Sequence, residues 1–149
     1  MSREPSLATL RELARCFQAF EAHSAAHIRT LGLTPPQFDI VATLGNTAGM
    51  SFKELGEKTL ITKGTLTGVV DRLEARGVVR RVCSDADRRS TRVELTSAGA
   101  ALFAEVFPGV VARTKRVFDK LGDADRMALE AGLLRLRLAF EAAMIEERK

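Results

Sequence analysis

The sequence predicts a mainly α-helical chain of six helices with one small β-hairpin, so its fold class is mainly α with a small β-wing (α+β). Apolar residues recur at helical spacing through most of the chain, as they do over residues 66–73. One region breaks this pattern, because two β-branched runs, 78–83 and 91–95, flank the polar stretch 84–90. That order is typical of a two-stranded hairpin with a charged tip.

The first two helices are marked by their end signals. Apolar spacing predicts a long first helix over about residues 6–31, which Gly32 ends. The next helix begins at Thr34, where Thr is the N-cap, proline is the first helical residue and Gln37 completes a capping box. It is expected to stop near Gly45.

Two short helices follow closely. A second capping box, Ser51 with Glu54, opens a third helix that ends near Lys58. After three connecting residues, Thr62 caps a fourth helix, which Gly77 closes. Two short helices joined this tightly and followed by a basic hairpin form a helix-turn-helix with a wing, an arrangement that binds DNA.

The last two helices carry apolar stripes that the small winged unit is too short to cover. Thr96 caps the fifth helix, and Pro108-Gly109 lies inside it and is expected to kink it. Gly122-Asp123 marks a break and the N-cap of a sixth helix, which ends near Glu147. Something outside the winged unit must therefore bury these stripes.

Composition limits the class of protein. A chain of 149 residues suits a single domain, 1–149, and its net charge of +4 is mildly basic. Residues 51–99 carry ten basic and seven acidic side chains, so most of the excess lies in the helix and hairpin. No apolar run approaches the ~18 residues of a membrane span and the N-terminus lacks signal-peptide order. We therefore expect a cytoplasmic protein without a membrane partner.

The sequence offers no catalytic or cofactor constellation. We find no nucleophile with a base, no paired carboxylates and no metal-ligand spacing, so we expect neither an enzyme nor a cofactor. His23 and His27 lie one helical turn apart, but two ligands do not make a metal site, and no metal is expected. Cys16 and Cys83 are too few for a disulfide framework.

Three stretches resemble the MarR family of bacterial transcription regulators. They are residues 34–38 (TPPQF), residues 65–77 (TLTGVVDRLEARG), and Asp87-x-Arg89 followed by Leu95-Thr96. The resemblance spans essentially the whole chain. It implies a homodimer whose first, fifth and sixth helices interlock, and two winged lobes that bind a pseudo-palindromic operator. In many members a small phenolic or other amphipathic ligand releases the DNA.

The resemblance also divides the chain. Residues 35–99 would form the winged DNA-binding lobe, while residues 1–34 and 100–149 would form the helical dimerisation region. The function expected from it is a sequence-specific regulator that binds double-stranded DNA, a repressor released by a ligand. Two alternatives stay open: a redox sensor that uses Cys16, and a winged-helix interaction module that does not bind DNA.

The exposed face of the fourth helix, Thr62 to Arg76, is expected to read the major groove. Hydroxyls and an ammonium at its start can reach bases and phosphates, where the helix dipole favours an anion. Gly64 and Gly68 would let the backbone approach the groove floor; the alternative is that they are merely tolerated, at ~1 kcal/mol each. The predicted contacts on this helix are Thr62, Lys63, Thr65, Thr67, Gly68 and Arg72, and Lys53 at the start of the third helix is a further candidate.

The wing is expected to enter the minor groove, whose negative potential attracts an extended guanidinium. Arg88 and Arg89 lie at the predicted tip. The resemblance implies that Asp87 orients the wing and that Arg89 is the arginine of the family motif. A solvated charge run on a turn is the alternative. Further phosphate contacts are expected from the strand residues Arg80, Arg81 and Arg92.

A ligand site cannot be assigned from the sequence. Five phenylalanines on the helices would be near a family pocket, although aromatic residues at helical spacing are more often core. These residues are Phe17, Phe20, Phe38, Phe103 and Phe107. Peroxide-sensing relatives place tyrosines beside a first-helix cysteine, and this chain has no tyrosine, so we expect Cys16 to be a buried, inert thiol.

Overall fold

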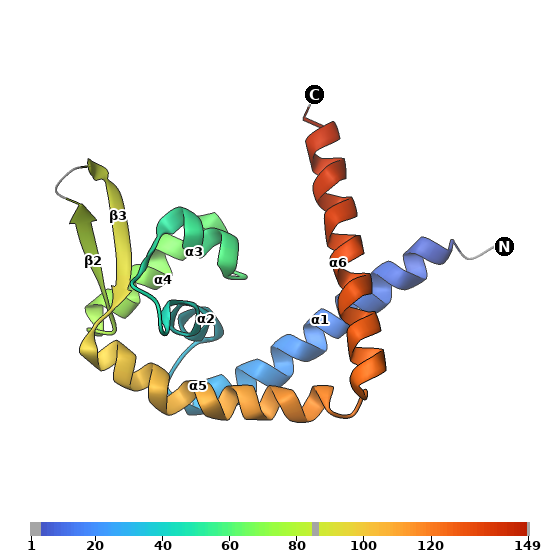
Figure 1. Cartoon of the computed structure of the whole chain (residues 1–149), viewed down its shortest axis with the longest axis horizontal. Coiled ribbons are helices and arrows are strands. Elements are labelled where there is room, and N and C mark those ends of the chain that lie inside the picture. The colour runs from blue at the N-terminus through green and yellow to red at the C-terminus, as the bar shows by residue number, and fades with distance from the viewer. Residues whose placement is uncertain (1–3, 85–86, 149) are drawn as a thin grey trace. The chain divides into compact units, whose positions relative to one another are not determined.

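A computed structural model describes residues 4–84 and 87–148, with the side chains of Ser84 and of residues 87–89 outside the description. The chain divides into two compact units, Met1–Val110 and Val111–Lys149. The elements are α1 (Pro5–Thr30), α2 (Pro35–Leu44), β1 (Met50–Ser51), α3 (Phe52–Lys58), α4 (Lys63–Ala75), β2 (Val79–Ser84), β3 (Asp87–Leu95), α5 (Ser97–Phe118) and α6 (Asp123–Glu146) (Figure 1). The six helices occur in the predicted order.

Both predicted capping boxes form. In α2 the Gln37 N–H donates to Thr34 Oγ1 at 3.4 Å, and the Thr34 N–H donates to Gln37 Oε1 at 3.1 Å. In α3 the Ser51 and Glu54 pair closes in the same way, at 3.1 and 2.8 Å. The hydrogen bonds from Ser51 also hold the pKa of Glu54 below its ordinary value.

The end of α4 has the geometry that its glycine predicts. Gly77 has φ of 71°, a left-handed conformation that glycine adopts without steric cost. The Val78 N–H donates to the Leu73 carbonyl at 2.9 Å, and the Gly77 N–H donates to the Glu74 carbonyl at 2.9 Å. These two bonds form a Schellman motif, which turns the chain from α4 directly into β2.

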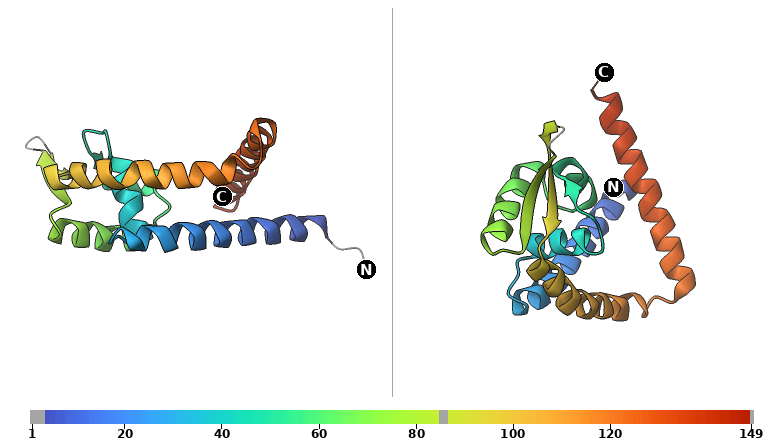
Figure 2. Two further views of the ribbon diagram at one scale, coloured as in Figure 1. Left: turned by 90° about the horizontal axis from the view of Figure 1, so that it is seen from below. Right: turned by 60° about the vertical axis from the view of Figure 1, so that its left-hand side comes forward.

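The sheet has three strands, where the sequence predicted two. β1 pairs antiparallel with β3, with Met50 opposite Val93, so the order is β1-β3-β2. A two-residue strand carries no alternating pattern, which is why β1 was missed. β3 also begins at Asp87, earlier than the predicted residue 91, and the register shifts between Cys83 and Ser84. The β2–β3 hairpin projects beyond the neighbouring helices (Figures 1 and 2).

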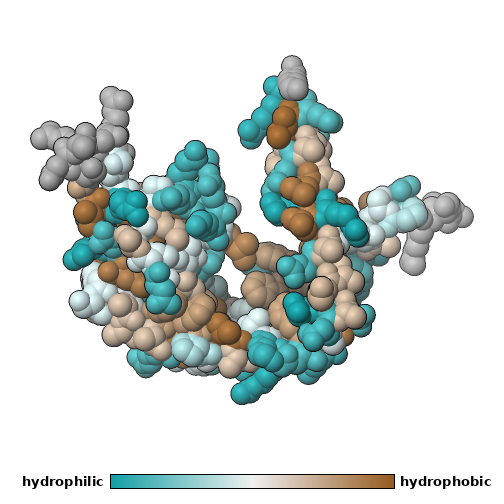
Figure 3. All heavy atoms as spheres, in the orientation of Figure 1, coloured by the Kyte–Doolittle hydropathy of each residue, from teal (hydrophilic) through white to brown (hydrophobic). Residues whose placement is uncertain are grey.

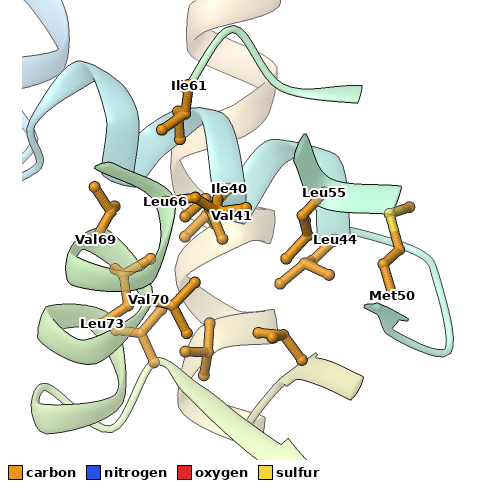
Figure 4. Close-up of a cluster of buried hydrophobic side chains, with 13 residues drawn as sticks. Ile40, Val41, Leu44, Met50, Leu55, Ile61, Leu66, Val69, Val70 and Leu73 are labelled. Atoms are coloured by element: carbon orange, nitrogen blue, oxygen red, sulfur yellow. The ribbon is translucent and has the colours of Figure 1, made fainter. Parts of the chain in front are cut away.

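One apolar core joins α2, α3, α4 and the sheet (Figure 4). Ile40, Leu55, Leu73 and Val93 come from these four parts, and all of them are fully buried. The predicted stripe on α4 supplies Leu66, Val69, Val70 and Leu73 to this core. The core therefore fixes which face of α4 points inward.

A second, smaller cluster joins the end of α1 to the first half of α5. It contains Ile28, Leu33 and Val106, with Phe38 packed against it. The start of α5 lies so close to the lobe that a Cβ built on Gly99 would collide with the Val78 backbone carbonyl. Glycine is therefore required at this position by the close approach of backbone to backbone.

The second unit has no buried side chain among its described residues, 111–148. α5 runs without interruption through Pro108, and the division between the two units falls after Val110. α6 has no buried residue, and apolar side chains stay exposed along it (Figure 3). Among the described residues, no helix is both long and apolar enough to cross a lipid bilayer.

Candidate nucleic-acid interface

The outward face of α4 carries the residues predicted to read DNA. Its inward stripe is buried, while Thr62, Lys63, Thr65, Thr67 and Arg72 are exposed. A Cβ added at Gly64 or Gly68 would meet no atom within 4 Å, so nothing in the described chain requires glycine at either position. The two glycines therefore form a surface without side chains, and the threonine hydroxyls and the charged groups of Lys63 and Arg72 lie around it.

The N-terminus of α4 is open to an anion. Thr62 is the N-cap residue, as predicted, but its side chain makes no capping hydrogen bond. Its hydroxyl lies 3.0 Å from the Thr65 hydroxyl instead. Because the Thr62 side chain does not cap these amides, the partial positive charge of the helix start is available to a phosphate.

Arg81 links the wing to α4. Its guanidinium pairs with Glu74 at 2.7 Å and with Asp71, both on α4, and lies 5.5 Å from the centroid of the Phe52 ring. The hydrogen bond that Arg81 donates to the Asp71 carboxylate raises the pKa of Arg81 above its ordinary value. Arg81 is therefore engaged in holding β2 against α4, rather than being free for the phosphate contact that was expected of it.

Arg80 and Arg92, which were also expected to contact phosphates, have partners within the lobe as well. Arg80 pairs with Glu94 at 3.0 Å, directly opposite it in the β2–β3 register. Arg92 donates a hydrogen bond to the Gly49 carbonyl, next to β1. The sequence could not show these contacts because they depend on strand register and on the unpredicted strand β1.

The remaining predicted contacts divide into two groups. Lys53 is exposed at the start of α3, and Arg72 is exposed with no ion pair to any described residue. The backbone of residues 87–89 lies in β3 rather than at a turn. The side chains of Asp87, Arg88 and Arg89 lie outside the described part of the structure, so their predicted roles stay predictions.

Two polar contacts between α2 and the flanks of α4 were not predicted. Asp39 Oδ2 accepts a hydrogen bond from the Leu60 N–H at 2.8 Å, and Arg76 Nη1 donates to Gln37 Oε1 at 3.3 Å. Burial raises the pKa of Asp39, against the smaller opposite effect of the Leu60 N–H. Both contacts join residues far apart in sequence, and no local pattern signals them.

The expectation for Cys16 was wrong. Cys16 is exposed on α1 rather than buried, and Cys83 is exposed on β2; both are free. His23 and His27 are half-buried on α1, and no group of three or more His, Cys, Asp or Glu among the described residues could hold a metal. Neither the cysteines nor the histidines therefore indicate a redox or metal site beside the α4 face.

The phenylalanines considered for a ligand pocket have different surroundings. Phe17 and Phe20 are exposed on α1, with ring centroids 6.3 Å apart. Phe103 stacks on Phe107 at 4.7 Å and packs against the lobe core, while Phe38 packs against the smaller cluster. Phe38 and Phe103 are thus partly buried at the edges of the two apolar clusters.

Comparison with known proteins agrees with this geometry. The MarR family model matches residues 31–90, from the end of α1 into the wing. The HTH-type transcriptional regulator MhqR of Bacillus subtilis (strain 168) is 30% identical over 122 residues, which cover 82% of this chain and 84% of that protein.

Solved structures share the fold. BpsR of Bordetella bronchiseptica, whose DNA binding is regulated by 6-hydroxynicotinic acid, is 29% identical with a TM-score of 0.80, covering 92% of this chain and 98% of that one. Sco3205 from Streptomyces coelicolor, solved in complex with DNA, has a TM-score of 0.80 at 23% identity, covering 93% and 89%. The chain therefore belongs to the MarR family of helix-turn-helix transcriptional regulators, which confirms the predicted family, fold class and regulatory role.

Proposed function

We propose that this regulator acts as a homodimer that binds a pseudo-palindromic duplex operator and represses transcription. Each protomer places the exposed face of α4 in a major groove. The observation that carries the proposal is that face: Thr65 and Thr67 are exposed beside two glycines with open space, at a helix start that the Thr62 side chain leaves uncapped. Such a surface can approach base edges closely and attract phosphate.

Each predicted contact has a role in this complex. Thr62, Lys63, Thr65, Thr67, Gly68 and Arg72 lie at the groove, and Lys53 contacts the backbone at the start of α3. Arg88 and Arg89 enter the minor groove from the wing, and Asp87 orients them. Because Arg80, Arg81 and Arg92 have partners within the lobe, they support the wing and are not assigned to phosphates.

A division of labour follows within one domain, 1–149. Residues 35–99 form the DNA-binding lobe, and residues 1–34 and 100–149 form the dimerisation region. Apolar side chains on α1 and α6, such as Leu7 and Leu138, are exposed in one chain. Their exposure supports a dimer in which a second copy of the chain buries them. A C2 dimer would present two α4 helices about one DNA turn, ~34 Å, apart.

A small phenolic or amphipathic ligand is proposed to release the operator. The support is the relative BpsR, whose DNA binding a small aromatic acid regulates. We propose further that the protein works in the cytoplasm, where it meets its DNA, and that it has no enzymatic activity.

Footprinting tests the proposal. DNA upstream of the protein's own gene would be incubated with the purified protein and treated with hydroxyl radical, with and without candidate aromatic acids. We expect two protected half-sites related by two-fold symmetry and spaced by one helical turn. A single protected half-site would contradict the dimer, and protection that no ligand removes would leave the repressor without the proposed release.

A further inference from the structure

Helix α2 contacts the polypeptide at both ends of α4. Before α4 begins, Asp39 Oδ2 accepts the Leu60 N–H at 2.8 Å, in the connection between α3 and α4. Where α4 ends, its C-cap residue Arg76 donates from Nη1 to Gln37 Oε1 at 3.3 Å. Two side chains from one short stretch of α2 therefore hold the two ends of the groove-facing helix.

The Arg76 contact is also tied to the end of α1. The same Nη1 donates to the Gly32 carbonyl at 3.1 Å, in the connection between α1 and α2. Gln37 is buried, and its Oε1 also accepts the Thr34 N–H of the capping box at 3.1 Å. Arg76 thus binds two acceptors, the Gly32 carbonyl and Gln37 Oε1, and the capping box at the start of α2 holds the second of them in place.

A second arginine on α4 provides a contrast. Arg72 lies one helical turn before Arg76 and is exposed, without a hydrogen bond or ion pair from its guanidinium to any described residue. The two arginines therefore differ in what they can offer DNA. Arg72 is free to neutralise a phosphate or meet a base, whereas Arg76 is already engaged with the α1–α2 connection.

We propose that Arg76 and Asp39 are positioning residues that fix the angle of α4, and that discrimination between operator and unrelated DNA depends on them. This inference rests on the proposed DNA-binding function. Direct readout requires side chains to meet base edges with good hydrogen-bond geometry, and a small tilt of the helix loses it. Attraction to phosphates is much less sensitive to tilt, because it is largely a matter of charge.

The test compares specific with non-specific affinity. The wild-type protein would select an operator from a randomised duplex library, and fluorescence anisotropy would give the Kd for that operator and for an unrelated duplex over a salt series. Arg76→Ala is expected to lower the ratio of the two affinities about tenfold and to leave the salt slope unchanged. Arg72→Ala, the matched control, is expected to reduce the slope by about 0.9 if it neutralises one phosphate.

A conservative pair tests the other end of α4. Asp39→Ala removes the acceptor for the Leu60 N–H, and it is expected to lower the same affinity ratio. Asp39→Asn keeps an acceptor oxygen at that position, and it is expected to preserve the ratio. Unfolding midpoints of all variants would be measured in urea, so that a general loss of folded protein is separated from a change in discrimination.

Three outcomes would overturn the inference. If Arg76→Ala reduces the salt slope as Arg72→Ala does, Arg76 is a phosphate contact. If Arg76→Ala weakens binding to both duplexes equally, Arg76 contributes to the general stability of the lobe. If Asp39→Asn loses discrimination as fully as Asp39→Ala, the Leu60 contact does not set the helix angle. Failure of the wild-type protein to select any duplex would instead remove the proposed function itself.

Discussion

The winged lobe buries its apolar side chains, whereas α6 leaves its apolar side chains exposed. In the lobe, Ile40, Leu55 and Leu73 are 0% exposed, so one chain completes that core by itself. On α6, Leu138 is 51% and Phe140 52% exposed, and the helix buries no residue. The difference indicates that the lobe is stable through its own packing, whereas α6 needs a covering surface to stabilise it.

The largest effect is expected from the lobe core. Leu73→Ala removes a fully buried side chain and leaves a cavity, so it is expected to lower the free energy of unfolding by ~2–5 kcal/mol. Urea denaturation followed by circular dichroism would measure it. A loss below ~1 kcal/mol would show that the lobe core is not the main source of stability in residues 35–99.

A substitution on α6 tests the other side of the comparison. Leu138→Asp is expected to weaken self-association by ~1–3 kcal/mol, because a charge would replace an apolar contact in the proposed dimer. Sedimentation equilibrium would measure the dissociation constant. Arg135→Ala, an exposed polar change on the same helix, is the control. An unchanged dissociation constant for Leu138→Asp would remove α6 from the interface.

The wing gives the next effect, on binding rather than folding. Arg89→Ala is expected to weaken operator binding by ~1–3 kcal/mol and to reduce the salt dependence, since one guanidinium would leave the DNA. Anisotropy titrations over a salt series would measure both. Operator affinity equal to that of the wild type would favour the solvated charge run on the wing.

The glycines of α4 are expected to show a trade-off. Gly64→Ala fills open space, so it is expected to stabilise the lobe by up to ~1 kcal/mol while weakening operator binding. Gly99→Ala is the contrasting control, because its Cβ would meet the Val78 carbonyl and destabilise the fold. Gain of stability without loss of binding would support the alternative that Gly64 is merely tolerated.

The smallest effect concerns pH and Asp39. Burial raises the pKa of Asp39 above its ordinary value of 3.8, so the folded state prefers the protonated acid. That contribution to stability is fully present below pH 3.8 and is lost as pH rises through the folded pKa. Urea titrations at several pH values should show Asp39→Asn gaining stability relative to wild type as pH rises toward 7. A difference that is flat with pH would contradict this.

The sequence predicted the helices well because their ends carry local signals. The capping boxes at Thr34 and Ser51 and the glycine at residue 77 are short-range chemistry, and each forms as expected. β1 was missed because two residues have no periodicity and depend on pairing with β3, some forty residues later in the chain. Local patterns determine helix ends, while strand pairing requires the tertiary fold.

The candidate site divides along the same line. Exposure of Thr65, Thr67 and Arg72 followed from the helical pattern, since a buried stripe fixes the opposite face. The contacts of Arg76 and Arg81 did not, because Arg76 meets α2 and Arg81 reaches back across the turn after α4 to its C-terminal half. An arginine in a sequence shows only that a charge is available, and the fold decides whether it meets a carboxylate or DNA.

The most direct measurement is equilibrium binding of the intact protein to duplex DNA from upstream of its own gene, from low to physiological salt. Tight binding is expected at low salt, with two protomers on each duplex. The affinity is expected to fall steeply as salt rises, with log Kd linear in log salt concentration. Absence of binding at low salt would contradict this expectation and would leave the lobe as a winged-helix module for protein contacts.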